Sequence, residues 1–238
     1  MIYAEILAGG KGTRMGNVNM PKQFLLLNKK PILIHTLEKF MLNPDFEKLI
    51  VIAPKEWMNY THDIIRKYVG GNSRIVVAEG GRDRNESIMN GIRYIENTYG
   101  IFDDDYIVTH DSVRPFITHR ILKENIQLVQ KSRAVNTVIE AIDTMIESED
   151  GTSVSNIPKR SLMYQGQTPQ SFHIQTLVSL YNRLTEAEKA ELTDACKIFA
   201  LAGLSIKIVK GELFNIKITT PYDLKVANAI IQEVIAND

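Results

Sequence analysis

Residues 1–8, MIYAEILA, run directly into residues 9–16, GGKGTRMG. An apolar run with β-branched and aromatic members that ends in glycines is typical of a buried strand opening into a loop. In open α/β sheets, ligands bind beyond the carboxyl ends of the strands. The glycine loop is therefore the first place where we expect a ligand.

The pairing of an apolar strand with an amphipathic helix recurs along the first half of the chain. The expected strands cover residues 1–8, 48–53, 74–78 and 106–109. The expected helices start at Pro31, cover residues 56–69, carry an apolar stripe from Ile88 to Tyr99, and follow Pro115. This alternation predicts right-handed βαβ units in an α/β protein, with a Rossmann-like, mostly parallel sheet flanked by helices.

The alternation breaks between residues 135 and 169, where strand-like stretches flank a hairpin signal at Asp150-Gly151. Such an excursion is either a flap over the site or a β-arm that reaches a partner subunit. We expect one domain over residues 1–238, with residues 135–169 as the arm. The regular pattern then resumes, with helices over 173–184 and 186–202, strands over 205–209 and 215–218, and a last helix from Pro221.

Composition excludes several classes of protein. The 28 Lys and Arg residues balance the 28 Asp and Glu residues, so no broad basic face is expected for nucleic acid. A single cysteine excludes a disulfide framework and a cysteine-based zinc site, and fits a reducing cytoplasm. Apolar runs such as residues 49–53 are too short to span a membrane, and the N-terminus lacks the basic start of an export signal.

The glycine loop matches neither common phosphate-binding fingerprint. It lacks the Gly-Lys-Ser/Thr of a P-loop, and its spacing G-x-G-x-x-x-G differs from that of dinucleotide-binding proteins. Arg14 and Lys22 nevertheless place two cations at the end of a strand, where they are suited to clamp an anion. The alternative is that both are solvated surface residues on a tight structural turn.

Two further strand ends carry polar residues. Residues 80–87, GGRDRNES, offer glycines and short polar groups to a flat base, or simply a helix cap at Asp83 or Asn85. Asp111 ends the fourth strand and is the only strand-end carboxylate that we expect to face the glycine loop, where it suits Mg²⁺ bridging phosphates. Its alternatives are an N-cap or a salt bridge to Arg114.

Lys217 is the polar member of the strand-like run 215–218, where it either closes a phosphate site or is an ordinary edge-strand lysine. His110 lacks a second His or Cys at metal or triad spacing, so we expect it to pack or to support its neighbours. Cys196 is expected to be a small buried hydrophobe.

Together these motifs resemble the cytidylyltransferase family that contains 2-C-methyl-D-erythritol 4-phosphate cytidylyltransferase and ribitol-5-phosphate cytidylyltransferase. The resemblance covers most of the chain and implies a Rossmann-like fold with a β-arm exchanged in a homodimer. The matching stretches are AGGKGTRMG from Ala8, PKQF from Pro21, GGRDRNES from Gly80, HDSVRP from His110, DTM from Asp143, TPQSF from Thr168, TDA from Thr193 and NIKITTPYDL from Asn215.

The resemblance also implies roles for individual residues. Arg14 and Lys22 would stabilise charge on the α-phosphate and the departing pyrophosphate, and Asp111 would bind Mg²⁺. Lys217 would hold the sugar phosphate together with Arg160 and Thr144 of the partner's arm. CTP would be held by Leu7, Ala8, Gly9, Gly10, Gly80, Gly81, Arg82, Asp83, Arg84, Asn85, Glu86, Ser87 and Ser112.

Within the family, four departures favour the ribitol-phosphate branch. This chain has AGG where methylerythritol enzymes usually have AAG, HDSVRP for HDAARP, Ile146 for a common Lys, and TDAC for a TDDAS-like run. The expected acceptor is ribitol 5-phosphate, giving CDP-ribitol, a precursor of poly(ribitol phosphate) wall teichoic acid. The alternatives are the methylerythritol enzyme of isoprenoid synthesis, a non-catalytic nucleotide-binding regulatory subunit, and, weakened by the glycine spacing, a dinucleotide-dependent oxidoreductase.

Overall fold

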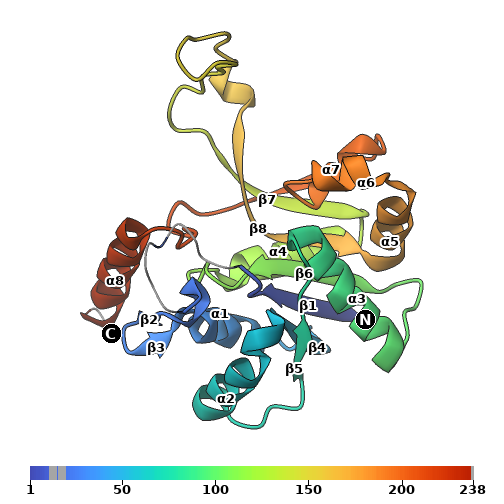
Figure 1. The fold of residues 1–238 in the computed structure, drawn as a ribbon, viewed down its shortest axis with the longest axis vertical. Helices are drawn as coiled ribbons and strands as arrows, with labels where there is room; N and C mark the ends of the chain where they lie inside the picture. The colour runs from blue at the N-terminus through green and yellow to red at the C-terminus, as the bar shows by residue number, and fades with distance from the viewer. Residues whose placement is uncertain (11–14, 16–19, 237–238) are drawn as a thin grey trace.

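A seven-stranded sheet forms the centre of the molecule (Figure 1) in the computed structural model, which describes residues 1–10, 15 and 20–236. The strand order is β5-β4-β1-β6-β8-β7-β9. The strands are β1 Ile2–Leu7, β4 Lys48–Ala53, β5 Ile75–Glu79, β6 Tyr106–Asp111, β7 Ala134–Glu140, β8 Tyr164–His173 and β9 Lys207–Lys210. A separate two-stranded sheet pairs β2 Leu26–Leu27 with β3 Lys30–Pro31.

Most neighbouring strands run parallel. β1 pairs in parallel with β4 and β6, β4 pairs with β5, and β7 pairs with β9. β8 alone among these strands is antiparallel to its neighbours β6 and β7. The predicted Rossmann-like, mostly parallel α/β sheet is therefore confirmed, and its β1 is apolar apart from Glu5 because helices cover both faces of the sheet.

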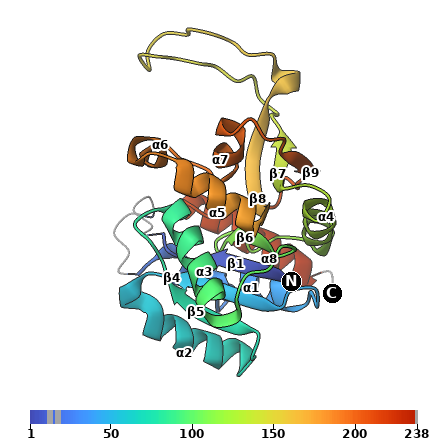
Figure 2. The same cartoon turned by 90° about the vertical axis from the view of Figure 1, so that its right-hand side faces the viewer.

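Most of the helices form two layers, one on each face of the sheet (Figure 2), while α8 packs in a separate cluster. Side chains of α1, α2 and α4 join one apolar cluster with the sheet, and those of α3, α5 and α7 join the other. The helices are α1 Ile32–Met41, α2 Met58–Val69, α3 Arg84–Tyr99, α4 His119–Val129, α5 Ile174–Arg183, α6 Glu186–Ala190, α7 Cys196–Leu201 and α8 Pro221–Ala236.

Helix α3 begins beside the carboxyl ends of β4 and β5. The Asp83 carboxylate accepts a hydrogen bond from the backbone N–H of Glu86 at 2.9 Å, which makes Asp83 the N-cap and decides between the two caps that the sequence allows. The helix ends at Gly100, whose φ of 76° suits glycine. The N-terminus of a long helix is thereby held at the edge where ligands bind in such sheets.

The chain between β7 and β8 projects away from the sheet as a long loop (Figures 1 and 2). The predicted arm, residues 135–169, includes most of β7 and the first six residues of β8, but both strands pair within the main sheet, so the projecting part is residues 141–163. A single antiparallel bridge joins Glu147 to Asn156, around a turn in which Asp150 accepts hydrogen bonds from Thr152 and Ser153. The arm thus packs little against its own domain.

Two predicted elements are wrong. Residues 186–202 form two short helices, since Asp194 accepts a hydrogen bond from the Cys196 N–H at 2.7 Å and so restarts the helix. Residues 215–218 are not a strand: Ile218 donates its N–H to the Val113 carbonyl, in a loop. The alternation that suggested a strand arises because Asn215 and Lys217 serve polar contacts while Ile218 packs against α8.

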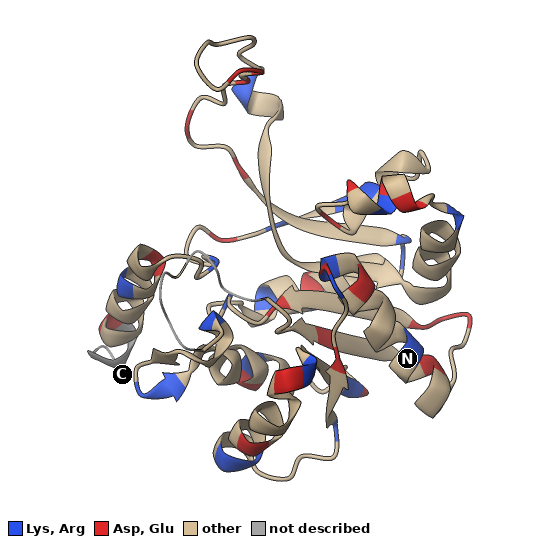
Figure 3. Ribbon diagram, in the orientation of Figure 1, with Lys and Arg blue, Asp and Glu red and all other residues tan. Residues whose placement is uncertain are grey.

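Positively and negatively charged residues are interspersed along the ribbon (Figure 3), in keeping with the zero formal net charge. Anion binding therefore depends on a local cluster. Within residues 1–10, 15 and 20–236, no helix is both long enough and apolar enough to cross a bilayer.

We predict that Phe172→Ala lowers the free energy of unfolding by about 3–5 kcal/mol, because it leaves a cavity between the sheet and α7. Phe172 is fully buried and stacks on Phe199 with ring centroids 5.4 Å apart. Urea unfolding of both variants measures the change, with Phe102→Ala as the matched control. Phe102 is 58% exposed, so its loss is expected to cost less than about 1 kcal/mol. Equal effects of the two substitutions would contradict the position of this core.

Candidate functional site

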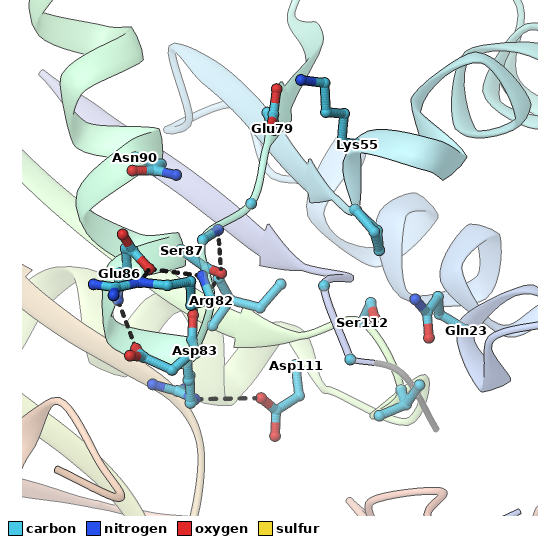
Figure 4. A pocket seen from close by; sticks show the side chains of 18 of the residues that line it. Gln23, Lys55, Glu79, Arg82, Asp83, Glu86, Ser87, Asn90, Asp111 and Ser112 are labelled. Atoms are coloured by element: carbon cyan, nitrogen blue, oxygen red, sulfur yellow. Dashed lines mark hydrogen bonds and ion pairs between the residues drawn. The ribbon is translucent and has the colours of Figure 1, made fainter. Parts of the chain in front are cut away.

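A pocket of about 870 Å³ opens at the carboxyl ends of β1, β4, β5 and β6. Ser87 and Glu86 of α3 lie on one side of it, Gln23 and Ser112 on the other, and Asp111 near one end (Figure 4). The lining residues are Leu7, Gly9, Gly10, Lys22, Gln23, Pro54, Lys55, Glu56, Glu79, Gly80, Gly81, Arg82, Asp83, Arg84, Glu86, Ser87, Asn90, Asp111, Ser112, Val113 and Lys217.

Asp111 is surrounded by three cations from three separate segments. Its Oδ2 lies 2.9 Å from Nζ of Lys217 and 3.5 Å from Nε of Arg114, while its Oδ1 lies 3.7 Å from Nε of Arg84. Burial of Asp111 raises the pKa of the carboxyl, but Arg84, Lys217 and Arg114 outweigh burial and hold that pKa well below its usual value. The carboxylate is therefore ionised, and the cluster keeps an excess of positive charge for an anionic ligand.

A buried hydrogen-bond network fixes this cluster from below. The Arg114 guanidinium donates to the Asn215 carbonyl at 2.8 Å, and the Asn215 amide donates to the Thr168 carbonyl at 3.0 Å. The Thr168 hydroxyl contacts Nδ1 of His110 at 2.9 Å and accepts from the Asp111 N–H at 3.2 Å. The strand end that carries Asp111 and the segment that carries Lys217 are thus held together.

His110 belongs to this scaffold. Burial lowers its pKa to about 4, with the nearby guanidiniums adding to the shift, so the imidazole is neutral near pH 7. Its Nε2 contacts the Arg114 carbonyl at 3.1 Å. The side chain is fully buried, which agrees with the predicted packing and supporting role.

The loop before α3 is shaped by its own hydrogen bonds. The Gly81 N–H donates to Oγ of Ser87 at 2.9 Å, and Ser87 donates to the Asp83 carbonyl at 2.7 Å. A Cβ at Gly81 would lie 2.5 Å from the Glu86 side chain, so only glycine fits without displacing Glu86. Gly81 lines the pocket, so a ligand can approach its backbone without meeting a side chain.

Lys22 is positioned by the residues on either side of it. It begins a 3₁₀ turn, Lys22–Phe24, in which the Gln23 amide donates to the Ala8 carbonyl of the glycine loop. Phe24 packs between Trp57 and Tyr60, with ring centroids 5.3 and 5.1 Å away. This apolar anchor holds Lys22 at the edge of the pocket.

Most residues predicted for the site line one pocket, from four strand ends and the start of α3. Asn85 instead turns away and donates to the Leu192 carbonyl at 3.2 Å, and Ala8 is buried behind the loop. Thr144 and Arg160 lie on the arm, where Arg160 donates to the Ile142 carbonyl at 3.1 Å. The prediction for Arg14 lies outside the described residues.

Sequence reasoning missed seven lining residues. It also treated Asp111 as the only carboxylate at a strand end beside the pocket. The missed residues are Gln23, Pro54, Lys55, Glu56, Glu79, Asn90 and Val113. Lys55, Glu56 and Glu79 follow or end strands, so the rule that identified Asp111 also applies to them. Asp111 is consequently not alone among strand-end carboxylates at the pocket, because Glu79 ends β5 there.

A pocket at the carboxyl edge of a Rossmann-like sheet, with glycine turns and a cluster of cations around Asp111, is typical of ligand-binding α/β proteins. A protein-family model described as 2-C-methyl-D-erythritol 4-phosphate cytidylyltransferase matches residues 2–233. The chain belongs to this family, the IspD family, and is thereby a cytidylyltransferase, a class of nucleotidyltransferase.

Solved structures agree with this assignment. The 4-diphosphocytidyl-2C-methyl-D-erythritol synthase from Anaerococcus prevotii is 28% identical, with a TM-score of 0.80, and the similarity covers 97% of this chain and 96% of that chain. The 2-C-methyl-D-erythritol 4-phosphate cytidylyltransferase from Francisella tularensis is also 28% identical, with a TM-score of 0.79 and coverage of 96% and 98%. The enzyme from Thermus thermophilus, 23% identical with a TM-score of 0.73 over 98% of this chain and 100% of that chain, shares the fold.

Proposed function

We propose that this protein transfers CMP from CTP to D-ribitol 5-phosphate, giving CDP-ribitol and pyrophosphate, for the synthesis of wall teichoic acid. The observation that carries the proposal is the cluster at the pocket, in which one ionised carboxylate meets three cations. Such a cluster suits a reaction that brings two anionic substrates together.

The proposed chemistry needs charge neutralisation more than proton transfer. An oxygen of the sugar phosphate attacks the α-phosphorus of CTP, and the bond from that phosphorus to the pyrophosphate oxygen breaks. A phosphate monoester has a second pKa of about 6 and is mostly dianionic near pH 7, so the nucleophile requires no general base. Together the substrates bring roughly six negative charges, which makes positioning and electrostatic stabilisation the main tasks.

The position of each residue around the pocket suggests which part of the substrates it would bind. Lys22, which lines the pocket, would stabilise charge on the α-phosphate and pyrophosphate, together with Arg14, whose role is proposed from its place in the sequence. Lys217 would hold the phosphate of the acceptor, because its Nζ already stands 2.9 Å from Asp111 beside the pocket. The turn from Gly80 to Ser87, which lines the pocket except at Asn85, would receive the nucleotide.

Asp111 fits a magnesium ion. Its Oδ1 lies 3.7 Å from the nearest ion-pair partner, Nε of Arg84, which is longer than a hydrogen bond, and the carboxyl is ionised. The described residues contain no group of three or more His, Cys, Asp or Glu that could hold a metal, so phosphates and water would complete the ligand set. When bound, the ion would neutralise charge on the phosphates.

Ribitol 5-phosphate is proposed as the acceptor because the four departures from the methylerythritol pattern all resemble the ribitol branch. Methylerythritol phosphate is the competing acceptor, because the family and its solved members are named for it. Ribitol 5-phosphate is a linear polyol with four free hydroxyls, whereas methylerythritol phosphate is shorter and carries a methyl branch. A polar site rejects a ligand that leaves its buried donors unpaired, so discrimination is expected.

We further propose that the arm completes the site of a second copy in a homodimer. Arg160 and Thr144 are exposed on the arm and are not among the residues that line the pocket of their own chain. The arm also exposes apolar side chains, including Ile142, Ile146, Ile157 and Leu162. Exposed apolar side chains clustered on a projecting segment favour a protein interface.

Pyrophosphate release with CTP is expected to be at least about tenfold more efficient with ribitol 5-phosphate than with methylerythritol phosphate. That ratio corresponds to ~1.4 kcal/mol of transition-state binding. The assay measures kcat/KM for each acceptor at saturating CTP, with a no-acceptor reaction as the control. The opposite preference would assign the chain to isoprenoid synthesis and leave the mechanism unchanged. If neither acceptor supports the release of pyrophosphate, a non-catalytic nucleotide-binding subunit would be favoured.

Asp111→Asn is expected to lower Mg²⁺-dependent turnover by about 10²–10³-fold, because the site loses its anionic anchor for the metal and for Lys217. Thermal melting reports whether the fold survives, which matters because three cations lose their partner. Glu124→Gln is the matched control, since it removes an ion pair with Arg120 on the surface of α4. Near-normal turnover of folded Asp111→Asn would disprove the metal assignment.

Mixing an inactive Arg160→Ala chain with an inactive Lys22→Ala chain is expected to restore activity. Random exchange makes about half of the dimers mixed, each with one intact site, so about a quarter of the wild-type activity should return. The measurement is pyrophosphate release after subunit exchange has been verified by mass spectrometry. Each variant exchanged with itself serves as the control. Absence of recovery would show that Arg160 serves its own chain.

A further inference from the structure

The imidazole of His110 is fully buried near the end of β6, one residue before Asp111. Its Nδ1 lies 2.9 Å from the Thr168 hydroxyl, and its Nε2 lies 3.1 Å from the Arg114 carbonyl. The ring also packs against Phe40, with the two ring centroids 5.2 Å apart. Packing alone would need only an apolar ring, so the two polar contacts require a separate explanation.

The chemistry of the two partners fixes the direction of each hydrogen bond. A carbonyl oxygen only accepts, so Nε2 of His110 carries a proton and donates it to the Arg114 carbonyl. The Thr168 hydroxyl already accepts the N–H of Asp111 at 3.2 Å, and in the described part of the chain its own proton has no acceptor other than Nδ1. A buried hydroxyl proton needs an acceptor, so Thr168 donates to Nδ1. Both contacts therefore select the neutral ring with its proton on Nε2.

The turn that follows β6 connects this ring to the pocket. The Arg114 N–H donates to the Asp111 carbonyl at 3.1 Å and closes the turn. Within the turn, the Ser112 N–H donates to the carbonyl of Leu7 at the end of β1, also at 3.1 Å. The side chains at the two ends of the turn form an ion pair, with Nε of Arg114 3.5 Å from Oδ2 of Asp111. The shape of the turn therefore decides how these two charged groups face each other.

We propose that His110 is a positioning residue whose ring, with its proton on Nε2, holds this turn closed and keeps the Arg114 guanidinium beside the Asp111 carboxylate. The Nε2–H group fixes the backbone of Arg114, and Thr168 ties the other ring nitrogen to the backbone of Asp111. The ring thus spans the two residues that form the ion pair. This role rests on the proposed function where it concerns CTP and Mg²⁺, whereas the directions of the hydrogen bonds concern the free protein.

¹⁵N NMR of the free wild-type protein tests the form of the ring directly. Correlations between the ring nitrogens and the ring carbon-bound protons distinguish the Nε2–H tautomer, the Nδ1–H tautomer and the imidazolium. The signals of His110 are identified by their loss in His110→Asn or His110→Gln. We expect the Nε2–H tautomer near neutral pH, and either of the other two forms would overturn the proposal.

His110→Gln and His110→Asn separate the two hydrogen bonds. Gln places an amide nitrogen near the position of Nε2 and keeps a donor for the Arg114 carbonyl, whereas Asn places an amide oxygen near Nδ1 and keeps only the acceptor for Thr168. Because His110→Asn leaves the buried Arg114 carbonyl unpaired, we expect CTP affinity in Mg²⁺ to fall about tenfold in His110→Asn and less than about threefold in His110→Gln. Calorimetry without an acceptor measures both affinities. Equal losses, or a larger loss in His110→Gln, would overturn the proposal.

His62→Asn is the matched control, because His62 is exposed on α2 and does not line the pocket, so CTP affinity should be unchanged. A purely packing role of His110 predicts lower melting temperatures for both variants with normal CTP affinity, and that result would also overturn the proposal. The NMR measurement needs no ligand and decides the form of the ring even if neither variant folds. A wild type that binds CTP but transfers CMP to neither sugar phosphate would refute the proposed function without deciding the role of His110.

Discussion

The electrostatic attraction between Asp111 and its three cations is the constraint on which the rest of the site depends. Lys217, Arg84 and Arg114 come from three segments that only the fold brings together. Three like charges in one place repel each other, so the Asp111 carboxylate is the group that lets them gather. A triphosphate and a metal ion entering the pocket would add further opposite charges to this cluster.

The sheet supplies the rigid frame for that cluster. β6 ends at Asp111, β1 ends at the glycine loop, and parallel pairing keeps both ends at one edge. The antiparallel β8 then passes beside β6 and brings Thr168 under the Asp111 backbone, where its hydroxyl accepts the Asp111 N–H. Backbone pairing thus fixes the position of the Asp111 carboxylate along the sheet edge. The hydrogen bonds of Thr168 and Asn215 hold the segments that carry the cations.

The sequence predicts those features that depend on local periodicity and on strand ends. Alternating strands and helices indicated the sheet, and the strand-end rule indicated the Gly80–Ser87 turn and Asp111. The sequence does not predict long-range contacts. Residues 215–218 look like a strand because polar and apolar residues alternate, yet the Ile218 N–H bonds to the Val113 carbonyl in a loop. The tie between Lys217 and Asp111 has no local signature, and neither has the boundary between the main sheet and the projecting arm.

The distribution of unpaired buried groups argues that this site was kept at a cost in stability. In the described part of the chain, such atoms occur on Glu5, Arg84, Asn85, Arg114, Gln170 and Asn215. Arg84 and Arg114 flank Asp111 directly, and the Asn215 carbonyl accepts a hydrogen bond from the Arg114 guanidinium. A fold selected for stability alone would fill such positions with apolar or fully paired side chains. Three of these six residues belong to the Asp111 cluster or contact it, and unmet hydrogen-bonding capacity there is typical of a pocket organised for charged ligands that are not part of the chain.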